Sequence, residues 1–452
     1  MTSSLMERIV ARQARVGVIG LGYVGLPLAV ALAERGFAVS GIDVDASRVA
    51  GINAGRSPIV DVTDAQLAPL VASGRLAAAA GYGAAGACDA LFVCVPTPFD
   101  RHKTPDLAYV HAAADGIAEH LRAGQLVVLQ STTYPGTTEE AIRPRLEASG
   151  LVAGRDFHLA FSPERIDPGV PAHTVLNTAK VVGGVTPACA ALAEALLLQL
   201  GSQVKVVSSP RVAEATKLLE NIFRAVNIAL VNELALLCER MDIDVWEVIE
   251  AAATKPFGFM PFWPGAGVGG HCIPVDPYYL AWKAREFDFA TRFIELAAEI
   301  NQNMPQHVVD LVTRALNEGG RPVAGARILV LGVAFKPNVD DARNSPAERA
   351  IALLLDRGAR VDYHDAQVPR LRVGGDAFLP DAVALASVPL DDAALADADA
   401  VVIVTRHDLV DYARVGRLAR LIVDTTAATR GQPGRIVRLG APWPRPTNRG
   451  AG

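Results

Sequence analysis

One cysteine of the chain lies in a setting that suits chemistry better than packing. Cys272 belongs to the segment GVGGHCIPVDPYYL, residues 267–280, where three glycines and His271 precede it and Asp276 follows four residues later. Glycines let the backbone approach a ligand, and a thiolate attacks efficiently when its pKa is lowered or a base is adjacent. We therefore predict that a substrate reaches Cys272 beside Asp276. A histidine next to a cysteine in sequence tends to point elsewhere in an extended segment, so we expect a structural or substrate-contact role for His271.

A second group of residues is suited to binding a dinucleotide. The string Gly20-Leu21-Gly22-Tyr23-Val24-Gly25 follows an apolar run and opens a helical pattern, and Asp43 ends the next apolar run 18 residues after Gly25. Such glycines let the backbone approach a pyrophosphate at a helix N-terminus, while the carboxylate accepts hydrogen bonds from a ribose and repels a 2′-phosphate. The pattern predicts an NAD site.

Lys217 and Asn221 are four residues apart in a long helical pattern, and Glu214 and Arg224 extend the same polar row. Residues at this spacing share one helix face. A solvated face is the usual explanation of such a row, so the row alone does not indicate catalysis.

The whole chain has an ordinary globular composition. It has 452 residues, 51% of them hydrophobic and 20% charged, with a net charge of −5. The length predicts two or three domains. The net charge does not indicate a surface that binds nucleic acid or a membrane. The N-terminus lacks a signal-peptide pattern, and no uninterrupted apolar run reaches the ~18 residues of a membrane span. Five scattered cysteines without a CxxC pair argue against disulfides or a metal site and favour the cytoplasm. Buried, inert thiols are expected at Cys88, Cys94, Cys189 and Cys238.

Strand and helix patterns alternate at both ends of the chain. RVGVIGLG, AVSGIDVD, DALFVCVPTP and QLVVLQSTT predict buried parallel strands, with a helix between the first two that ends at Gly36. Residues 211–255 contain no Gly or Pro and follow helical spacing, which predicts at least one long helix. From Gly325 the alternation returns in a similar order, but LGVAFKP replaces GxGxxG, so we expect this part to bind something other than a dinucleotide.

The predicted fold class is α/β, with two Rossmann-like, doubly wound parallel-sheet domains joined by a helical central domain. The predicted boundaries are 1–207 for the NAD-binding domain, 208–318 for the helical domain that carries dimerisation and active-site residues, and 319–438 for the second Rossmann-like domain. Residues 439–452, rich in Pro, Gly and Arg, are expected to be a disordered tail.

Seven motifs in order make the chain resemble a known family from about Arg15 to Thr426. They are GLGYVGLPLA, VCVPTPFD, STTYPGTT, FSPERIDPG, EATKLLENIFRAVNIALVNE, GVGGHCIPVDPYYL and GVAFKPNVDDARNSPA. The chain resembles the UDP-glucose/GDP-mannose dehydrogenase family of NAD-dependent nucleotide-sugar 6-dehydrogenases. The resemblance implies oxidation of a sugar C6 alcohol to a carboxylate with two NAD in turn. The aldehyde is trapped by the cysteine as a thiohemiacetal, which is oxidised to a thioester and hydrolysed.

The resemblance also implies roles for individual residues. Cys272 is the nucleophile with Asp276 beside it, Lys217 and Asn221 stabilise the oxyanion, and Thr132 and Glu164 position water and take part in proton transfer. The implied NAD contacts are Gly20, Gly22, Tyr23, Val24, Gly25, Asp43, Arg48, Pro96, Thr97, Thr132 and Arg343. The implied substrate contacts, which include the loop 257–267, are Glu164, Arg165, Lys217, Asn221, Arg224, Phe262, Gly265, Gly269, Arg292, Phe335 and Lys336. Lys336 is expected at the seam between domains, and Arg292 is expected to reach the substrate's diphosphate from a partner subunit of a homodimer built on the central helix.

Two positions depart from the family pattern, and both affect which residue roles the resemblance implies for this chain. Pro168 stands where the glucose-oxidising branch has a second glutamate, and Asn344 stands where many relatives have Glu. FGFMPFWPGAGVGGHCIPVDPYYL and TRFIELAAEIN look most like the UDP-N-acetylglucosamine 6-dehydrogenase branch, whose products usually feed surface polysaccharides or O-antigen. UDP-N-acetylmannosamine, UDP-N-acetylgalactosamine and UDP-glucose are alternative substrates.

Two rival functions are less favoured by the residues. A β-hydroxyacid dehydrogenase needs neither Cys272 nor a second α/β domain, and a non-catalytic NAD and nucleotide-sugar sensor should have lost Cys272 or Lys217.

Overall fold

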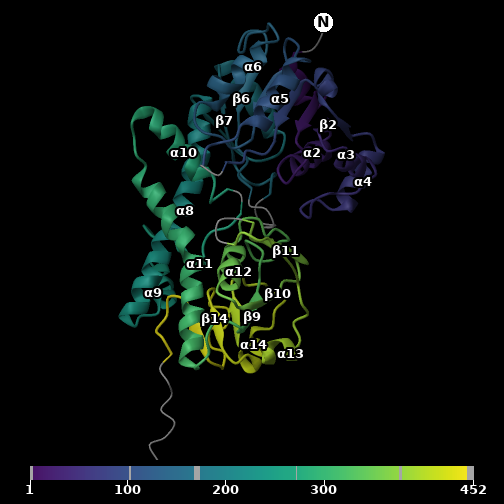
Figure 1. Cartoon of the computed structure of the whole chain (residues 1–452). Coiled ribbons are helices and arrows are strands. Elements are labelled where there is room, and N and C mark those ends of the chain that lie inside the picture. Colours follow the sequence, from purple (N-terminus) through teal and green to yellow (C-terminus); the bar gives the residue numbers. More distant parts are fainter. Residues whose placement is uncertain (1–3, 101–102, 167–173, 271, 376–378, 445–452) are drawn as a thin grey trace, which may run out of the picture. The chain divides into compact units, whose positions relative to one another are not determined.

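The computed structural model describes residues 4–100, 103–166, 174–270, 272–375 and 379–444. Its chain groups into two compact units, the first made of Met1–Glu220 with Tyr278–Ala290 and the second of Asn221–Pro277 with Thr291–Gly452. Each unit contains its own sheet (Figure 1). The predictions for Pro168 and His271 lie outside the described residues.

The sheet of the first unit has eight strands among the described residues, in the order β3-β2-β1-β4-β5-β6-β7-β8. Its strands are β1 (Arg15–Ile19), β2 (Ala38–Asp43), β3 (Leu76–Ala80), β4 (Ala90–Val93), β5 (Leu126–Leu129), β6 (His158–Phe161), β7 (Lys180–Gly184) and β8 (Val204–Val207). Neighbours pair in parallel except β6 with β7, which are antiparallel. The predicted doubly wound sheet is confirmed, with one reversed pair within it.

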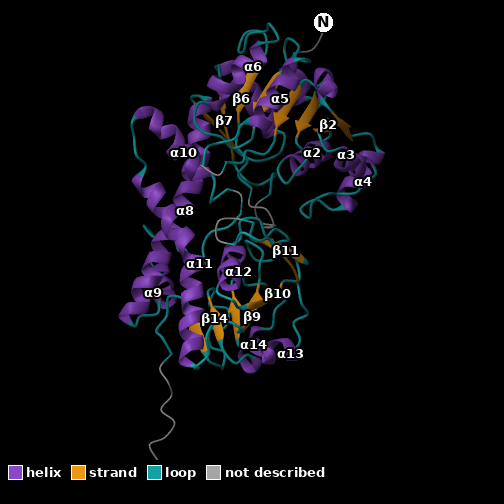
Figure 2. Ribbon diagram, viewed as in Figure 1, coloured by secondary structure: helices purple, strands orange, loops and turns teal. Residues whose placement is uncertain are grey.

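Helices cover both faces of this sheet (Figure 2). Alternate residues of β4 and β5 point to opposite faces, which is why these strands are apolar throughout: Phe92 and Val128 belong to one core, Leu91 and Val127 to the other. The helical segments are α1 (Leu5–Val10), α2 (Gly25–Glu34), α3 (Ala46–Asn53), α4 (Asp64–Ala72), the 3-10 helix η1 (Tyr82–Ala87), α5 (Ala108–Ala118), the π-helix η2 (Thr137–Ile142), α6 (Arg143–Glu147) and α7 (Pro187–Leu198).

The long helical stretch predicted over 211–255 is two helices, α8 (Pro210–Met241) and α9 (Val245–Ala253). Asp242 has a φ of +59°, which ends α8, and the side chain of Asp244 accepts from Trp246 N and caps α9. The sequence pattern missed this break because neither residue is Gly or Pro. Further along, α10 (Asp276–Ala284), η3 (Arg285–Phe287) and α11 (Arg292–Glu318) follow.

The sheet of the second unit has five strands among the described residues, all parallel, in the order β10-β9-β13-β14-β15. A separate antiparallel pair is formed by β11 (Arg370–Val373) and β12 (Val383–Ala386). The remaining elements are β9 (Arg327–Leu331), α12 (Pro346–Asp356), β10 (Arg360–His364), α13 (Asp392–Asp397), β13 (Ala400–Ile403), α14 (Tyr412–Leu418), β14 (Ile422–Asp424) and β15 (Ile436–Arg438). Apolar residues of α11 and α12 pack on one face, and those of α13 and α14 on the other.

The chain beyond Arg438 was predicted to be a disordered tail, and its first part is instead ordered. Leu439 is buried, Gly440 N donates to Glu239 Oε1 at 2.8 Å, and the Trp443 indole donates to Glu318 at 2.7 Å. These hydrogen bonds to α8 and α11 could not be predicted from the Pro- and Arg-rich composition of the segment. Residues 445–452 lie outside the described part of the chain.

Of the described helices, α8 alone could cross a membrane by length and composition, a test that core helices of soluble proteins also pass. Of the five cysteines, Cys272 is exposed and the other four are buried, as predicted.

Candidate active site

The glycine turn of the first unit has the conformation that a dinucleotide-binding turn requires. Gly20 has a φ of +87°, and a Cβ there would lie 2.6 Å from the carbonyl oxygen of Cys94. A Cβ on Gly25 would lie 1.8 Å from the Gly20 carbonyl oxygen, whereas Gly22 faces open space. The turn leads into α2, whose N-terminus has no side-chain cap. Its first N–H groups are therefore suited to an anion.

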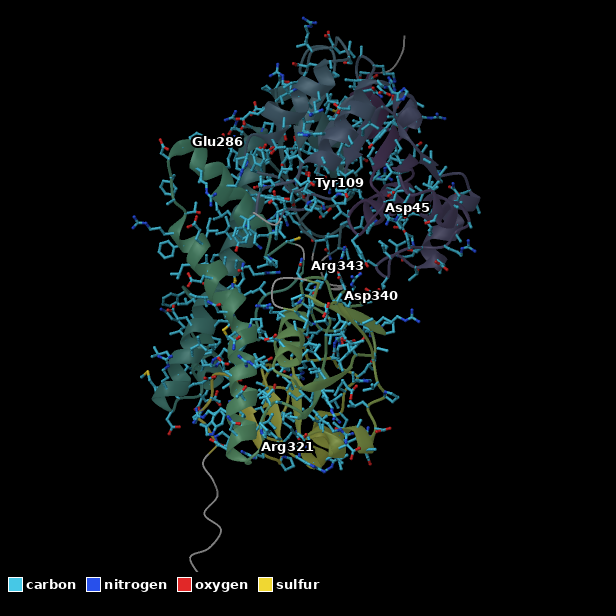
Figure 3. All side chains as sticks on the ribbon, viewed as in Figure 1. Asp45, Tyr109, Glu286, Arg321, Asp340 and Arg343 are labelled. Carbon is cyan, nitrogen blue, oxygen red and sulfur yellow. The ribbon has the colours of Figure 1, made fainter. Side chains whose placement is uncertain are left out.

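Asp43, at the end of β2, is fixed beside this turn. Its carboxylate accepts from Leu21 N at 2.8 Å and Asp45 N at 2.9 Å, and Arg48 Nη1 lies 3.0 Å from Oδ2. Asp45 caps α3, which carries Arg48 (Figure 3). The carboxylate is buried and held in place before any ligand arrives. An open glycine turn, an uncapped helix and an oriented carboxylate together fit NAD, and the contacts of Asp43 and Arg48 with it stay predictions.

The other predicted cofactor residues follow neighbouring parallel strands. Pro96 and Thr97 come after β4 and half-buried Thr132 after β5, so they share the carboxyl edge of the sheet with Gly20 and Asp43. Ser131 Oγ donates to the Val95 carbonyl at 2.7 Å and joins the two segments. Tyr279, wholly buried, donates to the carbonyls of Thr97 and Pro98. The sequence pattern gave no role to Tyr279.

Glu164, after β6, is the most heavily bonded of the predicted catalytic groups. One oxygen accepts from Arg165 N at 2.7 Å, Ile166 N at 3.1 Å and Lys180 Nζ at 2.7 Å. The other accepts from Gln130 Nε2 at 2.8 Å and again from Lys180 at 3.0 Å. Lys180 is wholly buried at the start of β7. These donors hold Glu164 in one orientation as an acceptor.

Cys94 extends the same network. Its Sγ donates to Gln130 Oε1 at 3.4 Å. Burial raises the pKa of the Cys94 thiol, and the charge of Glu164 raises it further against the opposing effect of Lys180. The thiol stays protonated, in keeping with the inert role predicted for it.

The polar row on α8 is mostly buried, which corrects the solvated face suggested as its usual explanation. Glu214 is fully buried and accepts from Gly136 N, Thr138 N and Thr138 Oγ1 at 2.6 to 2.8 Å, so it caps η2. Burial raises the pKa of Glu214 against these hydrogen bonds. Lys217 and Asn221 are each 9% exposed, and only Arg224 is open to solvent. Within the described residues the Lys217 ammonium has no hydrogen-bond or ion-pair partner, which suits a group that meets a ligand.

In the second unit, the segment from Cys272 to Asp276 forms a turn that opens α10. The Cys272 carbonyl accepts from Val275 N at 3.1 Å and Asp276 N at 2.8 Å. Asp276 is buried, and its Oδ2 accepts a hydrogen bond from the Asn221 amide. The structure thus joins three predicted catalytic residues, Cys272, Asp276 and Asn221, through backbone and side-chain bonds.

The glycines before Cys272 are required by close packing against the loop after β9. A Cβ on Gly269 would lie 2.9 Å from both Phe335 Cβ and the Asn344 carbonyl oxygen. Gly270 has a φ of +86°, and its Cβ would lie 3.0 Å from the Phe335 ring. Asn344 has a φ of +53° and donates to the Gly270 carbonyl at 3.1 Å. Asn tolerates this left-handed conformation, which accounts physically for the residue at this departure from the family pattern.

Several predicted ligand contacts have protein partners in this structure. Arg165 pairs with Glu220 at 2.7 Å and donates to the Ala179 carbonyl. Arg343, in the loop after β9 (Figure 3), makes a two-pronged pair with Asp341. Their ligand contacts stay predictions, as do those of half-buried Lys336 and of exposed Arg224 and Arg292.

The loop 257–267 is fixed by two contacts that were not predicted. Phe262 packs edge-on against Phe223 of α8, and Gly265 N donates to Asn232 Oδ1 at 3.0 Å. Asn232, fully buried, also donates to Asn301 of α11 at 2.9 Å. Amide residues inside amphipathic helices are the signal that could have revealed this link. Within the described residues, no group of three or more His, Cys, Asp and Glu side chains could hold a metal ion.

Three domain models of one protein family match the chain in order. The NAD binding domain matches residues 14–200, the central domain 211–303 and the UDP binding domain 329–430. The chain belongs to the UDP-glucose/GDP-mannose dehydrogenase family. It is therefore an NAD-dependent nucleotide-sugar dehydrogenase, and the predicted family, fold, enzyme class and cofactor are confirmed.

Similar members of this family act on different sugars by name. A UDP-N-acetyl-D-glucosamine 6-dehydrogenase of Pseudomonas aeruginosa is 40% identical over 356 residues, covering 78% of this chain and 83% of its own. An NDP-N-acetyl-D-galactosaminuronic acid dehydrogenase of Ralstonia nicotianae is 36% identical, covering 91% and 95%. The solved UDP-D-ManNAc dehydrogenase of Pyrococcus horikoshii is 32% identical with a TM-score of 0.85, covering 94% and 99%. Family membership thus indicates a UDP-sugar without specifying one sugar.

Proposed function

We propose that the protein oxidises the C6 hydroxyl of UDP-N-acetyl-D-glucosamine to a carboxylate. One sugar, two NAD and one water give the uronate, two NADH and three protons. The choice of sugar is supported by the motifs around Cys272 and by the 40% identical relative named for this substrate.

The observation that carries the proposal is exposed Cys272 in its glycine loop, beside Asp276 and Asn221. Bound NAD supplies the hydride acceptor for both oxidations. The Cys272 sulfur adds to the C6 aldehyde to give a thiohemiacetal. Loss of a second hydride from C6 then gives a thioester. Water then cleaves the C–S bond, releasing the carboxylate and restoring the thiol. A single oxidation would need no covalent trap; the second one does.

Lys217 and Asn221 are proposed to stabilise the oxyanion at C6. A fixed ammonium and amide suit this electrostatic role, and removing one such donor typically costs about 100-fold or more in kcat. The hydrogen bond from Asn221 to Asp276 holds the amide in place. Thr132 and Glu164 are proposed to position the hydrolytic water and to take part in proton transfer, with Lys180 fixing the Glu164 carboxylate.

The binding assignments follow the same proposal. NAD is bound by the glycine turn with Asp43, Arg48, Pro96, Thr97 and Arg343. The UDP-sugar is bound by Arg165, Arg224, the 257–267 loop, Phe335 and Lys336, with Arg292 from a partner subunit. We further propose a cytoplasmic homodimer that forms through the central helix.

The deciding measurement is NADH formed per UDP-N-acetylglucosamine, followed at 340 nm to completion with limiting sugar. We expect two NADH per sugar for the wild type and at most one for Cys272→Ser. One NADH per sugar in the wild type would contradict the covalent route and favour a single-step β-hydroxyacid-type dehydrogenase.

The sugar itself is tested in parallel with the UDP forms of N-acetylmannosamine, N-acetylgalactosamine and glucose. A higher kcat/KM for one of these would replace N-acetylglucosamine and leave the chemistry intact. NAD binding without turnover of any of the four sugars would favour the sensor function.

A further inference from the structure

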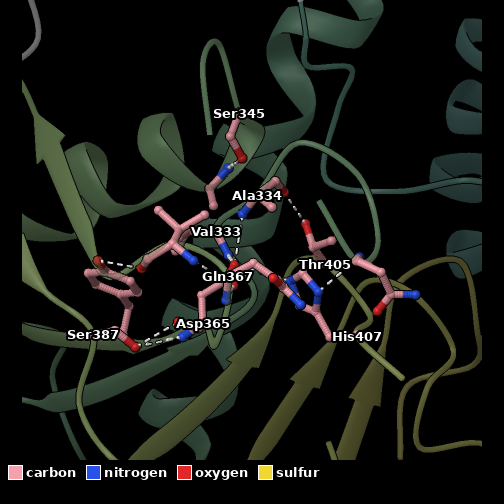
Figure 4. Close-up of polar contacts among 12 residues, drawn as sticks. Val333, Ala334, Ser345, Asp365, Gln367, Ser387, Thr405 and His407 are labelled. Atoms are coloured by element: carbon pink, nitrogen blue, oxygen red, sulfur yellow. Dashed lines mark hydrogen bonds and ion pairs between the residues drawn. The ribbon is translucent and has the colours of Figure 1, made fainter. Parts of the chain in front are cut away.

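The loop after β9, residues 333–344, is anchored by a buried carboxylate at its start (Figure 4). Asp365 Oδ2 accepts from Val333 N at 2.8 Å and Ala334 N at 3.0 Å. The same oxygen lies 3.1 Å from His407 Nε2. Asp365 and His407 are 2% and 5% exposed, so water does not compete strongly for these bonds.

The other ring nitrogen of His407 bonds to the middle of the loop. Asn338 N donates to His407 Nδ1 at 3.1 Å. Because Nδ1 accepts, a neutral ring carries its hydrogen on Nε2 and donates it to Asp365. Asn338 has a φ of +60°, and its side chain exchanges hydrogen bonds with Asp408. One imidazole therefore bridges the anchor and the middle of the loop.

The far end of this loop supports the segment that carries Cys272. Gly270 N donates to the Arg343 carbonyl at 3.2 Å, and Asn344 Nδ2 donates back to the Gly270 carbonyl at 3.1 Å. Phe335 packs closely against both glycines: a Cβ on Gly269 would lie 2.9 Å from Phe335 Cβ, and one on Gly270 would lie 3.0 Å from the Phe335 ring. Cys272 follows two residues later. A shift of the loop would therefore move Gly269 and Gly270, the glycines nearest to Cys272 in the chain.

We propose that His407 is a positioning residue for Cys272, acting through the bond from Asn338 and the loop 333–344. An apolar residue of similar size would fill the space but leave the Asn338 N–H and the Asp365 carboxylate without this partner. The catalytic part of the inference rests on the proposed role of Cys272 as nucleophile; the positioning part rests on the contacts alone.

Two substitutions of His407 each keep one of its two hydrogen bonds and remove the other. In His407→Asn the amide oxygen occupies the place of Nδ1 and accepts from Asn338. In His407→Gln the amide nitrogen occupies the place of Nε2 and donates to Asp365, while the acceptor for Asn338 is lost. Thr429→Val is the control, because it removes a buried hydrogen bond to Asp424 in the same unit without touching the loop.

The first measurement is amide hydrogen exchange of the full-length protein. We expect the peptide that contains Gly269 and Gly270 to exchange about tenfold faster in His407→Gln, and to stay within about twofold of the wild type in His407→Asn and Thr429→Val. Unchanged exchange in His407→Gln, or equal acceleration in all three variants, would overturn the positioning role.

The second measurement is catalytic. In His407→Gln we expect free aldehyde to escape and NADH per sugar to fall below two, with the Kd for NAD unchanged and His407→Asn restoring the wild-type ratio. If the wild type produces no NADH from any UDP-sugar, the proposed function fails while the exchange result still decides the positioning link. If His407→Gln does not fold, Asn344→Gly suits the φ of +53° and removes only the bond to Gly270. It should accelerate the same peptide, and no acceleration would overturn the proposal.

Discussion

Buried charges in this protein are matched by partners that are distant in sequence. Lys180 and Glu164 are 16 residues apart and pair at 2.7 Å, although both are almost wholly buried. The sequence marked Glu164 by its motif but gave no reason to single out Lys180, because the two meet through the antiparallel pairing of β6 with β7. Arg165 and Arg343 show the converse: their types suit phosphate, and here they bind nearby carboxylates.

Breaking the buried pair should be costly and non-additive. Lys180→Met leaves the Glu164 charge uncompensated, so we expect a loss of about 3 to 5 kcal/mol in the free energy of unfolding, and a similar loss for Glu164→Gln. The double variant should cost less than the sum of the two, because no lone charge remains. Chemical denaturation of the four proteins tests this. Additive costs would show that the pair is not coupled.

The pair of Asp43 and Arg48 makes a prediction about cofactor choice. Asp43→Ser removes the charge that repels a 2′-phosphate and releases Arg48, which lies 3.0 Å from Oδ2. We expect the ratio of kcat/KM for NADP to that for NAD to rise by about tenfold or more. In Asp43→Ser/Arg48→Ala this gain should disappear. A ratio that is unchanged in the single variant would place the ribose elsewhere.

At the scale of elements, the two sheets repeat one strand–turn–carboxylate arrangement. Gly20 N donates to the Ile42 carbonyl and Gly332 N to the His364 carbonyl, and both glycines have φ near +80°. Leu21 N and Val333 N each donate at 2.8 Å to a carboxylate at the end of the next strand, Asp43 as the last residue of β2 or Asp365 directly after β10. The repeated order of strands was predictable because each turn is local in sequence. The contact of His407 was not, because His407 lies in the loop after β13, 42 residues after Asp365.

The carboxylate of the second arrangement should make stability depend on acid pH. Burial alone would raise the pKa of Asp365, but hydrogen bonds from His407 and the backbone N–H groups of Ala334, Val333 and Gln367 lower it from 3.8 to about 2. A lowered pKa stabilises the fold above the unfolded value, here by about 2 kcal/mol, and this contribution is lost as pH falls from about 4 to 2.

Asp365→Asn tests that contribution. The variant should lose about 2 kcal/mol or more in the free energy of unfolding at pH 7. Its deficit should shrink by about half at pH 3, where Asp365 of the unfolded wild type is mostly protonated while that of the folded wild type is still mostly ionised. Denaturation curves at both pH values give the comparison. The deficit of Thr425→Val, which removes a buried hydrogen bond to the Ile403 carbonyl and none to a carboxylate, should not change. A deficit for Asp365→Asn that is equal at both pH values would contradict the low pKa.

At the scale of the molecule, prediction from sequence succeeded where the signal was periodic. The alternation of strands and helices is as predicted toward both ends of the described chain. It failed where one residue overrides a pattern. Asp242 ends a helix within a stretch that contains no Gly or Pro. Glu214 belongs to a polar row on α8 but is buried. Leu439 and Trp443 hold in place a segment whose composition predicts a disordered tail.

The exposed apolar residues of α8 lead to a prediction about assembly. Leu230 and Leu237 are 50% and 49% exposed and seven residues apart, so they lie on one face together with Leu234 and Met241, which are also exposed. An exposed apolar helix face normally packs against another surface. In a two-fold dimer, the same residues of a second copy of the helix would contact it. We therefore expect the wild type to sediment as a dimer.

Leu230→Glu/Leu237→Glu should convert that dimer to a monomer. Each buried leucine contributes about 1.5 to 3 kcal/mol, and two-fold symmetry counts each substitution twice, so the dissociation constant should rise well over 100-fold. Sedimentation velocity across a range of concentrations measures this change. The control is Leu409→Glu, because Leu409 is 79% exposed in a loop outside the helix and its substitution should leave the dimer intact. A double variant that sediments like the wild type would place the subunit interface on a different surface.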